Sequence, residues 1–399
     1  MKRYDIIIIG GGIMGLSLAY RLCELKGDRR RILIIEKESD VAMHASGRNS
    51  GVLHAGIYYG SDSLKARFCR QGSMMMKRYC QDHGLAINRC GKLIVSKDEK
   101  EEKRLFELYE MARVNGAKVA LINQKQVNEI DRSVKTFSTA IWSPETASIS
   151  PKAVCHSLHQ ELTDTGVDFA FNSPVTGVDI QGKTVETQDK RFSYDTLINT
   201  AGLYADKIAQ CCGVTDDYAL LPFKGIYFIS RSDTIRLKTN VYPVPDPQYP
   251  FLGVHFTITV DGRTKIGPTA IPALWREHYS GIERFKAKEF GNILNWYMKS
   301  VVGNHFNFRA LLASEAKYLF RGNLLKEAQK MVNLDLAAAR FVRSAPGIRA
   351  QLYDKRHKRL VNDFIIEHKQ DTIHVLNAVS PAFTSAFAMA DYIIKEKLC

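Results

Sequence analysis

The clearest hydrophobic pattern in the chain lies at its N-terminal end. An apolar run of strand length, 4–9, leads into three glycines and then into a stretch with helical apolar spacing, from Leu16 to about Lys26. A second apolar run, 31–35, follows and ends at Glu36. A strand, a glycine turn, a helix and a second strand in this order predict a βαβ unit.

Two hydrophobic patterns, one typical of helices and one typical of strands, alternate along the rest of the chain. Helical spacing recurs at 63–83, 99–115, 127–130, 150–164, 204–212 and 381–397. Strand-like runs occur at 92–95, 140–142, 167–171, 175–180, 184–187, 194–202, 364–368 and 373–376. Between about 220 and 340 the pattern changes to strands of alternating polarity at 225–231, 252–260 and 264–267, followed by helical stretches at 282–298 and 311–334.

This order predicts an α/β fold with an α+β second domain. A chain of 399 residues exceeds what one hydrophobic core usually holds, so we expect two domains. A Rossmann-like nucleotide-binding domain, discontinuous in sequence, is expected to contain residues 1–80, 145–215 and 341–399. An antiparallel-sheet substrate or cap domain is expected to contain residues 81–144 and 216–340.

The glycine turn has the spacing of a dinucleotide site. Gly10 permits the tight turn, Gly12 lets a pyrophosphate approach the backbone, and Gly15 lets the helix pack closely on the sheet. The N-terminus of the helix favours the phosphate charge. Glu36, at the end of the second strand, can accept hydrogen bonds from a ribose diol, which favours FAD or NAD over NADP.

Composition narrows the class of protein further. The chain is 45% hydrophobic and 25% charged, and we find no repeat and no apolar run long enough to span a bilayer. Its eight cysteines have neither metal-ligand spacing nor a disulfide framework. We therefore expect a globular, reduced, cytoplasmic protein without a metal site.

The net charge of +14 needs an explanation. Nucleic acid, an anionic membrane face or an anionic substrate are the three alternatives. The densest basic cluster, 355–359, has no base-stacking aromatic residues or nucleic-acid module beside it, so it is typical of a solvated loop and we expect no nucleic-acid partner.

Several motifs together carry a family resemblance. The glycine turn 10–15, the segment 199–206 and the Pro-initiated C-terminal helix resemble the FAD-dependent D-amino-acid oxidase superfamily. Within it, the chain resembles the L-2-hydroxyglutarate dehydrogenase/oxidase family over nearly its whole length. The motifs for this closer match are 50–59, 63–67, 250–257, 267–268, 347–351 and 377–385.

The resemblance implies a reaction. It is the oxidation of (S)-2-hydroxyglutarate to 2-oxoglutarate, with a hydride passing from C2 to N5 of a non-covalently bound FAD and electrons leaving to a quinone of the respiratory chain or to O2. This chemistry requires a base for the hydroxyl proton, cations for two carboxylates and positive potential near the reduced flavin.

The resemblance also implies candidate catalytic and substrate-binding residues. His54, among small residues, is the favoured base, and His255 is the alternative base or a hydrogen-bond donor. Arg349 is expected to hold a carboxylate in a bidentate fork. The remaining substrate candidates are Lys224 at the domain junction and, for the distal carboxylate, Tyr58, Tyr59, Lys65 and Arg67.

The expected FAD contacts surround the glycine turn and the start of the C-terminal helix, whose N-terminus can stabilise an anionic flavin ring. They are Gly10, Gly12, Ile13, Met14, Gly15, Glu36, Lys37, Ser46, Arg48, Asn49, Ser50, Val175, Ala201, Gly202, Gly347, Pro381, Ala382 and Thr384.

Three alternatives remain open at this point. The first is a sister flavoenzyme acting on an amino acid, as glycine oxidases do, or on glycerol 3-phosphate. The second is a flavin-containing protein that binds nucleic acid. The third is a peripheral enzyme on the cytoplasmic face of the inner membrane that passes electrons to quinone, with Trp296, Tyr297 and Phe306 in the segment 293–308 as its contact.

Overall fold

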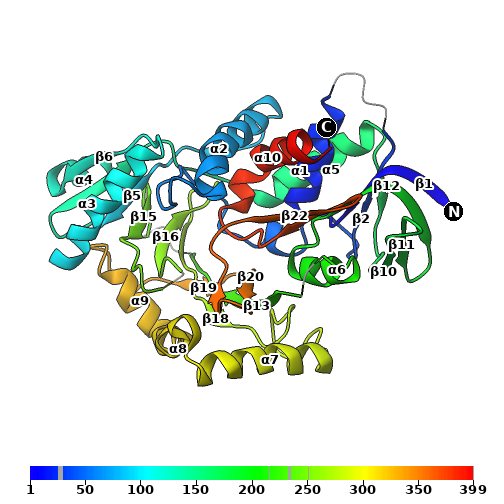
Figure 1. The fold of residues 1–399 in the computed structure, drawn as a ribbon. Helices are drawn as coiled ribbons and strands as arrows, with labels where there is room; N and C mark the ends of the chain where they lie inside the picture. Colours follow the sequence, from blue (N-terminus) through cyan, green and yellow to red (C-terminus); the bar gives the residue numbers. More distant parts are fainter. Residues whose placement is uncertain (26–29, 215, 232–234, 250, 399) are drawn as a thin grey trace.

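The computed structural model describes residues 1–25, 30–214, 216–231, 235–249 and 251–398. Within these ranges the strands form four sheets, and helices cover them on several sides (Figure 1). The expected helix end at Lys26 and the first residue of the 250–257 motif lie outside the described residues.

The first sheet has a parallel centre built around the N-terminal strand. Its parallel strands are, in spatial order, β23 (Thr372–Leu376), β12 (Arg191–Asn199), β1 (Lys2–Ile9), β2 (Ile32–Ile35) and β9 (Asp168–Ala170). Antiparallel additions are β22 (Ile365–Lys369) on β23 and the hairpin of β10 (Val175–Asp179) and β11 (Thr184–Thr187) on β12. Ile9 stands opposite both Ile35 and Asn199, so the glycine turn leaves the sheet between two neighbouring strand ends.

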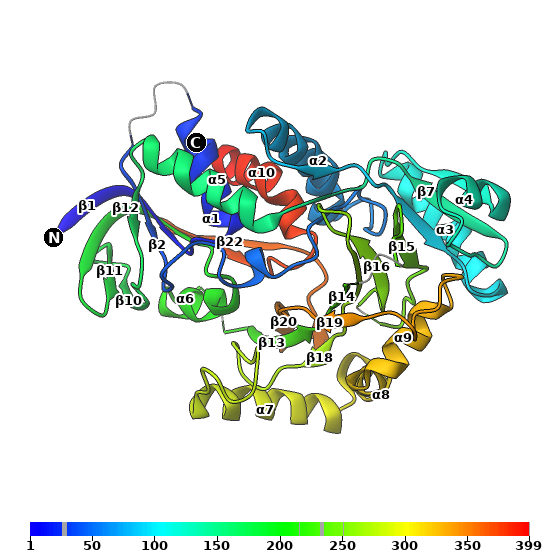
Figure 2. The ribbon, with the colours of Figure 1, turned by 180° about the vertical axis from the view of Figure 1, so that it is seen from behind.

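Helices cover both faces of this sheet, which explains why β1 is apolar at consecutive positions. Ile6 and Ile8 pack against one group of helices, and Ile7 and Ile9 pack against Ile208 on the other face. The first group is α1 (Ile13–Cys23), α2 (Leu64–Asp82), α5 (Pro151–Asp164) and α10 (Ala382–Ile393), and the other face carries α6 (Ala205–Cys211). Figures 1 and 2 show α1, α5 and α10 together on one side of the strands.

The second sheet is antiparallel apart from the pair β5–β15. Its strands, in spatial order, are β19 (Phe341–Arg343), β14 (Phe228–Ser230), β17 (Thr264–Gly267), β16 (His255–Ile258), β15 (Asn240–Pro243), β5 (Lys92–Val95), β7 (Thr139–Ser143) and β6 (Ala120–Asn123). The helices α3 (Glu99–Val114) and α4 (Gln124–Ile130) lie at the β6 and β7 end, far from the first sheet (Figure 1).

Two smaller sheets join these parts. One is antiparallel, with β18 (Ile271–Pro272), β13 (Tyr218–Gly225), β20 (Gly347–Asp354) and β21 (Arg359–Leu360), and the other contains β3 (Val52–Leu53), β8 (Ala147–Ile149) and β4 (Ile87–Asn88). Three helices run along the base of the molecule in Figures 1 and 2, namely α7 (Ala287–Val302), α8 (Phe308–Ala316) and α9 (Arg321–Gln329). No helix in the described part of the chain has the length and apolar character needed to cross a lipid bilayer.

Most predicted elements are present, and the differences have local causes. Strand β13 was not predicted, because Pro222 and Lys224 interrupt its apolar pattern. The expected single helix at 311–334 is two helices, α8 and α9, since Phe320 has extended backbone angles between them. Strand pairing places β19 in the second sheet and β20 beside β13, while the predicted domain boundaries stay a prediction.

Candidate active site

The glycine turn is closed by the end of β12. Gly10 has a φ of +109°, and a methyl group on it would lie 2.7 Å from the carbonyl oxygen of Thr200. A methyl group on Gly15 would overlap the carbonyl oxygen of Gly10. These two positions therefore require glycine for the tight turn and for close helix packing.

The carboxylate of Glu36 is held beside this turn. One oxygen accepts a hydrogen bond from the Gly11 N–H at 2.7 Å, and the other accepts one from the Glu38 N–H at 3.0 Å. Burial raises the pKa of this carboxyl group. Each oxygen keeps a further lone pair, so the group can still accept a hydrogen bond from a ribose hydroxyl.

A single continuous cavity starts at this turn and ends at two histidines. It is lined by the glycine turn, the loop 45–50, the end of β12, the start of α10 and the strands β13, β16 and β20. The predicted residues on its wall are Gly12, Ile13, Met14, Ser46, Arg48, Asn49, Ser50, His54, Gly202, His255, Gly347, Arg349, Pro381, Ala382 and Thr384. The predicted residues off its wall are Gly10, Gly15, Glu36, Lys37, Tyr58, Tyr59, Lys65, Arg67, Val175, Ala201 and Lys224.

The loop 45–50 is shaped by its own hydrogen bonds. Asn49 donates to the carbonyl groups of Ala45 and Ser46, at 3.2 and 2.8 Å, and accepts from the Gly51 N–H at 2.8 Å. The Ser46 hydroxyl accepts from the Ile13 N–H at 2.9 Å. The loop is thus fastened to the first turn of α1, which makes both part of one wall.

The start of α10 faces the same cavity. In the described part of the chain, the N–H groups of Phe383 and Thr384 make no backbone hydrogen bond, and both residues line the cavity. The Thr384 hydroxyl accepts from the His54 N–H at 3.2 Å and donates to the Val52 carbonyl at 3.3 Å. A helix N-terminus with unpaired donors is therefore tied to the strand that precedes His54.

Both histidines are uncharged at neutral pH. Burial, with the charges of Lys92, His255 and Arg349, lowers the pKa of His54 to about 3, and its Nδ1 is buried without a partner. Burial lowers the pKa of His255 to about 4. The His255 Nδ1 lies 2.8 Å from the Gly253 carbonyl, so Nδ1 carries the proton and Nε2 is an acceptor. Each ring can therefore accept a proton.

Arg349 brings positive charge to the cavity. It stands opposite Phe223 in the pairing of β20 with β13, and its guanidinium lies 4.7 Å from the centre of the Phe251 ring. No ion pair involves it among the described residues. Burial lowers its pKa, with opposing effects from Tyr227, Tyr59 and Glu315. An unpaired guanidinium on a cavity wall is suited to bind a carboxylate.

The cavity wall also carries groups that the sequence did not single out. Glu315 of α8 lines the cavity, and its carboxylate accepts from the Ala270 N–H at 2.6 Å. Tyr227 and Tyr242 line it as well. Lys92 does not line the cavity but lies next to Tyr242. It opens the apolar strand β5, a position usual for an exposed strand end, yet it is fully buried. Only the tertiary neighbours reveal these residues.

The sequence model for the family described as FAD dependent oxidoreductase (DAO) matches residues 5–396. This chain belongs to that family. The superfamily resemblance and the predicted fold class are thereby confirmed, and FAD is the family's cofactor.

Two relatives with established names are similar to this chain over nearly its whole length. The human mitochondrial L-2-hydroxyglutarate dehydrogenase is 35% identical over 418 residues, which cover 99% of this chain and 89% of that protein. An Escherichia coli L-2-hydroxyglutarate dehydrogenase is 33% identical over 398 residues, with 98% of this chain and 93% of that one covered.

Solved structures agree on the fold. L-alpha-glycerophosphate oxidase from Mycoplasma pneumoniae, reduced with dithionite and with FAD bound, has a TM-score of 0.76 at 22% identity and covers 99% of this chain and 94% of its own. Glycine oxidase from Geobacillus kaustophilus has a TM-score of 0.71 at 17% identity, with the same coverage. At this identity the likeness concerns the fold alone.

The residues on the cavity wall, together with Glu36 beside it, fit the family's cofactor. The turn at Gly12 and the carboxylate of Glu36 suit a pyrophosphate and a ribose. A methyl group on Gly347 would overlap the carbonyl oxygen of Arg48, so β20 approaches the loop 45–50 closely. The unpaired donors of α10 suit the anionic edge of a reduced flavin.

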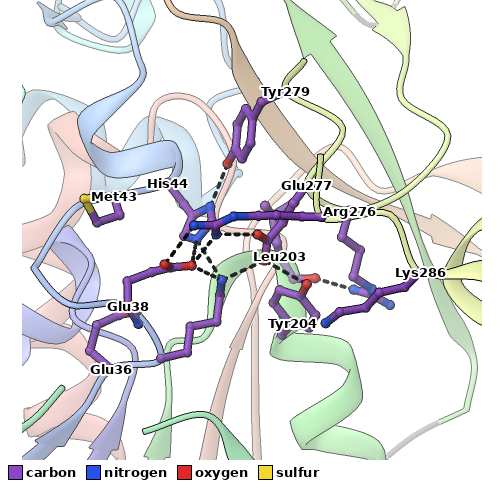
Figure 3. Close-up of polar contacts among 12 residues, drawn as sticks. Glu36, Glu38, Met43, His44, Leu203, Tyr204, Arg276, Glu277, Tyr279 and Lys286 are labelled. Carbon is purple, nitrogen blue, oxygen red and sulfur yellow. Dashed lines mark hydrogen bonds and ion pairs between the residues drawn. The ribbon is translucent and has the colours of Figure 1, made fainter. Parts of the chain in front are cut away.

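A cluster of ion pairs that includes Glu38, His44 and Glu277 lies beside Glu36 (Figure 3). The Lys37 ammonium contacts Glu38 and lies 2.6 Å from a Glu277 oxygen, and Arg284 pairs with Glu38 at 2.5 Å and Glu277 at 2.7 Å. His44 adds a contact to Glu38 at 2.8 Å. We call these five residues the latch cluster, because they join the loop after β2 to the segment 276–286. Lys37 therefore has two carboxylate partners, and its predicted cofactor contact stays a prediction.

Proposed function

We propose that this chain oxidises L-2-hydroxyglutarate, (S)-2-hydroxyglutarate, to 2-oxoglutarate. The observation that carries the proposal is an unpaired Arg349 beside two uncharged histidines in one cavity. Identity of 35% over nearly the whole length to a protein named L-2-hydroxyglutarate dehydrogenase supports the choice of substrate.

The residues divide the chemistry as follows. When bound, non-covalent FAD supplies the acceptor for the hydride that leaves C2 of the substrate. Arg349 binds the carboxylate next to C2 and orients that carbon. His54 takes the hydroxyl proton at its unpartnered Nδ1, and His255, whose Nε2 is an acceptor, is the alternative base for the same proton. The start of α10 offsets the negative charge that reduction places on the cofactor.

The decisive experiment is an anaerobic titration of the purified yellow protein with each enantiomer of 2-hydroxyglutarate, followed by flavin absorbance. We expect the S enantiomer alone to bleach the flavin. Bleaching by the R enantiomer, or by neither, would contradict the proposed substrate.

One observation favours a second candidate. Glu315 is a carboxylate on the cavity wall, and an amine substrate needs such an acceptor. An oxidase of glycine or another amino acid is therefore the alternative, with glycerol 3-phosphate as a third substrate. The same titration with glycine and glycerol 3-phosphate separates these functions.

The electron acceptor is proposed to be a quinone or O2, with the enzyme peripheral on the cytoplasmic face of the inner membrane. Apolar side chains are exposed along the segment 282–320, among basic residues. They are Ile282, Phe285, Met298, Val302, Leu319 and Phe320. The aromatic residues named from the sequence do not form this surface, since Tyr297 is buried and Trp296 and Phe306 pack beside it.

Vesicle binding tests this surface. We expect the protein to sediment with vesicles that contain anionic phosphatidylglycerol and less with neutral phosphatidylcholine. The double variant Leu319→Ser, Phe320→Ser should lose this binding. Phe137→Ser, which removes an exposed aromatic ring in the segment between α4 and β7, is the matched control. Equal sedimentation of both variants would contradict the membrane contact.

A further inference from the structure

Lys92 is a buried cation that has no acid partner. It lies in β5 between β15 and β7, opposite Asn240 and Ser143, and its exposed fraction is 0%. Its Nζ makes no hydrogen bond to any described residue. A buried, unpaired ammonium group destabilises a protein by several kcal/mol, so its presence needs a compensating role.

The immediate surroundings of Lys92 are aromatic. Its Nζ lies 4.5 Å from the centre of the Tyr58 ring and 5.1 Å from the centre of the Tyr242 ring. These contacts favour a cation but leave its N–H donors unused. The Tyr58 hydroxyl is also buried without a partner. Two neighbouring groups thus each have a hydrogen-bond donor that no described residue uses.

Lys92 and Tyr58 do not line the cavity themselves, but Lys92 lies next to Tyr242, which does. Tyr242 and His255 both line it, and their rings lie 4.0 Å apart. The charges of Lys92 and Arg349 both lower the pKa values of His54 and His255. Both cations therefore act on the same pair of histidines.

We propose that Lys92, assisted by the Tyr58 hydroxyl, binds the second carboxylate of the substrate, the one distant from the reacting carbon. This inference rests on the proposed function and assigns the group that distinguishes a 2-hydroxy diacid from a 2-hydroxy monoacid. Arg349 lines the cavity with the two histidines, and Lys92 lies next to Tyr242 of the same wall, so a dicarboxylate has one cation available for each carboxylate.

The test compares two unreactive ligands, glutarate and pentanoate, which differ by one carboxylate. Their dissociation constants are measured on the purified holoenzyme by the change in flavin absorbance. We expect the wild type to bind glutarate at least 100-fold more tightly than pentanoate. In Lys92→Met this preference should fall to about threefold or less, because glutarate weakens and pentanoate does not.

Three further variants make the result specific. Lys103→Met removes an exposed lysine of α3 and should retain the wild-type preference. Lys65→Met removes the rival cation predicted for the distal carboxylate. Tyr58→Phe removes only the hydroxyl and should weaken glutarate about tenfold, so it carries the test if Lys92→Met loses its flavin.

The outcomes separate the two proposals. A wild-type preference that survives in Lys92→Met, or that disappears in Lys65→Met instead, overturns the role of Lys92. A wild type with no preference for glutarate overturns it as well. The wild type could bind glutarate through Lys92 while neither enantiomer of 2-hydroxyglutarate bleaches the flavin. This result would contradict the proposed oxidation but support the anion-binding site at Lys92.

Discussion

Charges are arranged in opposite ways in two regions of this protein. In the latch cluster, two cations and two carboxylates alternate, with three of their four contacts at 2.5 to 2.7 Å, and the Glu277 side chain is 6% exposed. Around the histidines, Arg349 and Lys92 have no acid partner among the described residues.

The difference separates structural charge from binding charge. Charges that are paired within the chain hold two segments together and have little left to offer a ligand. Charges that stay unpaired reduce stability in the empty protein and are satisfied only when an anion binds. The comparison therefore predicts that substitutions in the two regions have opposite effects on activity and stability.

Arg349→Met should give the largest effect. Loss of the fork to the substrate carboxylate is expected to lower kcat/KM for (S)-2-hydroxyglutarate by about 1,000-fold, or about 4 kcal/mol. The melting temperature should stay the same or rise, because an unpaired charge is removed. Arg349→Lys keeps the charge and should mainly raise KM. Wild-type kinetics in Arg349→Met would place the carboxylate elsewhere.

Glu277→Gln should act on stability instead. It removes the negative charge of one of the two carboxylates that Lys37 and Arg284 share, so the free energy of unfolding should fall by about 3 kcal/mol in a denaturant titration. The kcat of the flavin-loaded protein should change less than twofold. Breaking the exposed pair Glu99–Lys103 with Lys103→Met is the control and should change stability by less than about 1 kcal/mol. Equal losses of stability in Glu277→Gln and Lys103→Met would contradict the structural role of the latch cluster.

His54→Ala tests the proposed catalytic base. We expect anaerobic flavin reduction to slow by about 100-fold, or about 2.7 kcal/mol, because the hydroxyl proton loses its acceptor. Stability should change little, since Nδ1 has no partner to lose. Stopped-flow absorbance measures the rate. An unchanged rate, with a slow His255→Ala, would transfer the role to His255.

The pH dependence of KM gives the smallest effect. Burial lowers the pKa of Lys92 to about 7, so below pH 7 the group is charged and ready for a carboxylate. Above pH 7 binding must take up a proton, and KM should rise up to tenfold per pH unit, or about 1.4 kcal/mol. His54, His255 and Cys69 stay neutral here, with pKa values of about 3, 4 and 12.

Steady-state kinetics between pH 6 and 9 measures this slope. Lys92→Met should give a flat profile at a higher KM. A flat profile in the wild type would mean that Lys92 does not carry the charge that the substrate meets.

The sequence predicts local features well because their physical causes are local. The turn at Gly10 and Gly15, the helix start at Ser150 and the acid at Glu36 follow from conformational freedom, capping and strand length. The placement of His54, His255 and Arg349 on one cavity wall agrees with the family resemblance, although their chemical roles stay proposals.

The rest depends on contacts between distant parts of the chain. Lys92 has the sequence context of an exposed strand end, and its burial is decided by Tyr58 and Tyr242. By its sequence, Glu315 is a polar residue of an ordinary amphipathic helix, and only its hydrogen bond with the Ala270 N–H shows that it is held in place. Likewise, the pairing of Lys37 requires Glu277, which no local pattern connects with it.

Strands from distant parts of the chain form the first sheet, so its members are synthesised at different times. The strand β1 is made before its neighbours, since β12 is far along the chain and β23 and α10 come later still. A growing polypeptide on the ribosome therefore has the glycine turn long before it has the wall that faces it. Bound flavin, seen by its yellow colour, should therefore appear only once the segment 382–393 has emerged. Because its neighbours are made late, the isoleucines of β1 must until then be covered by chaperones or by other parts of the nascent chain.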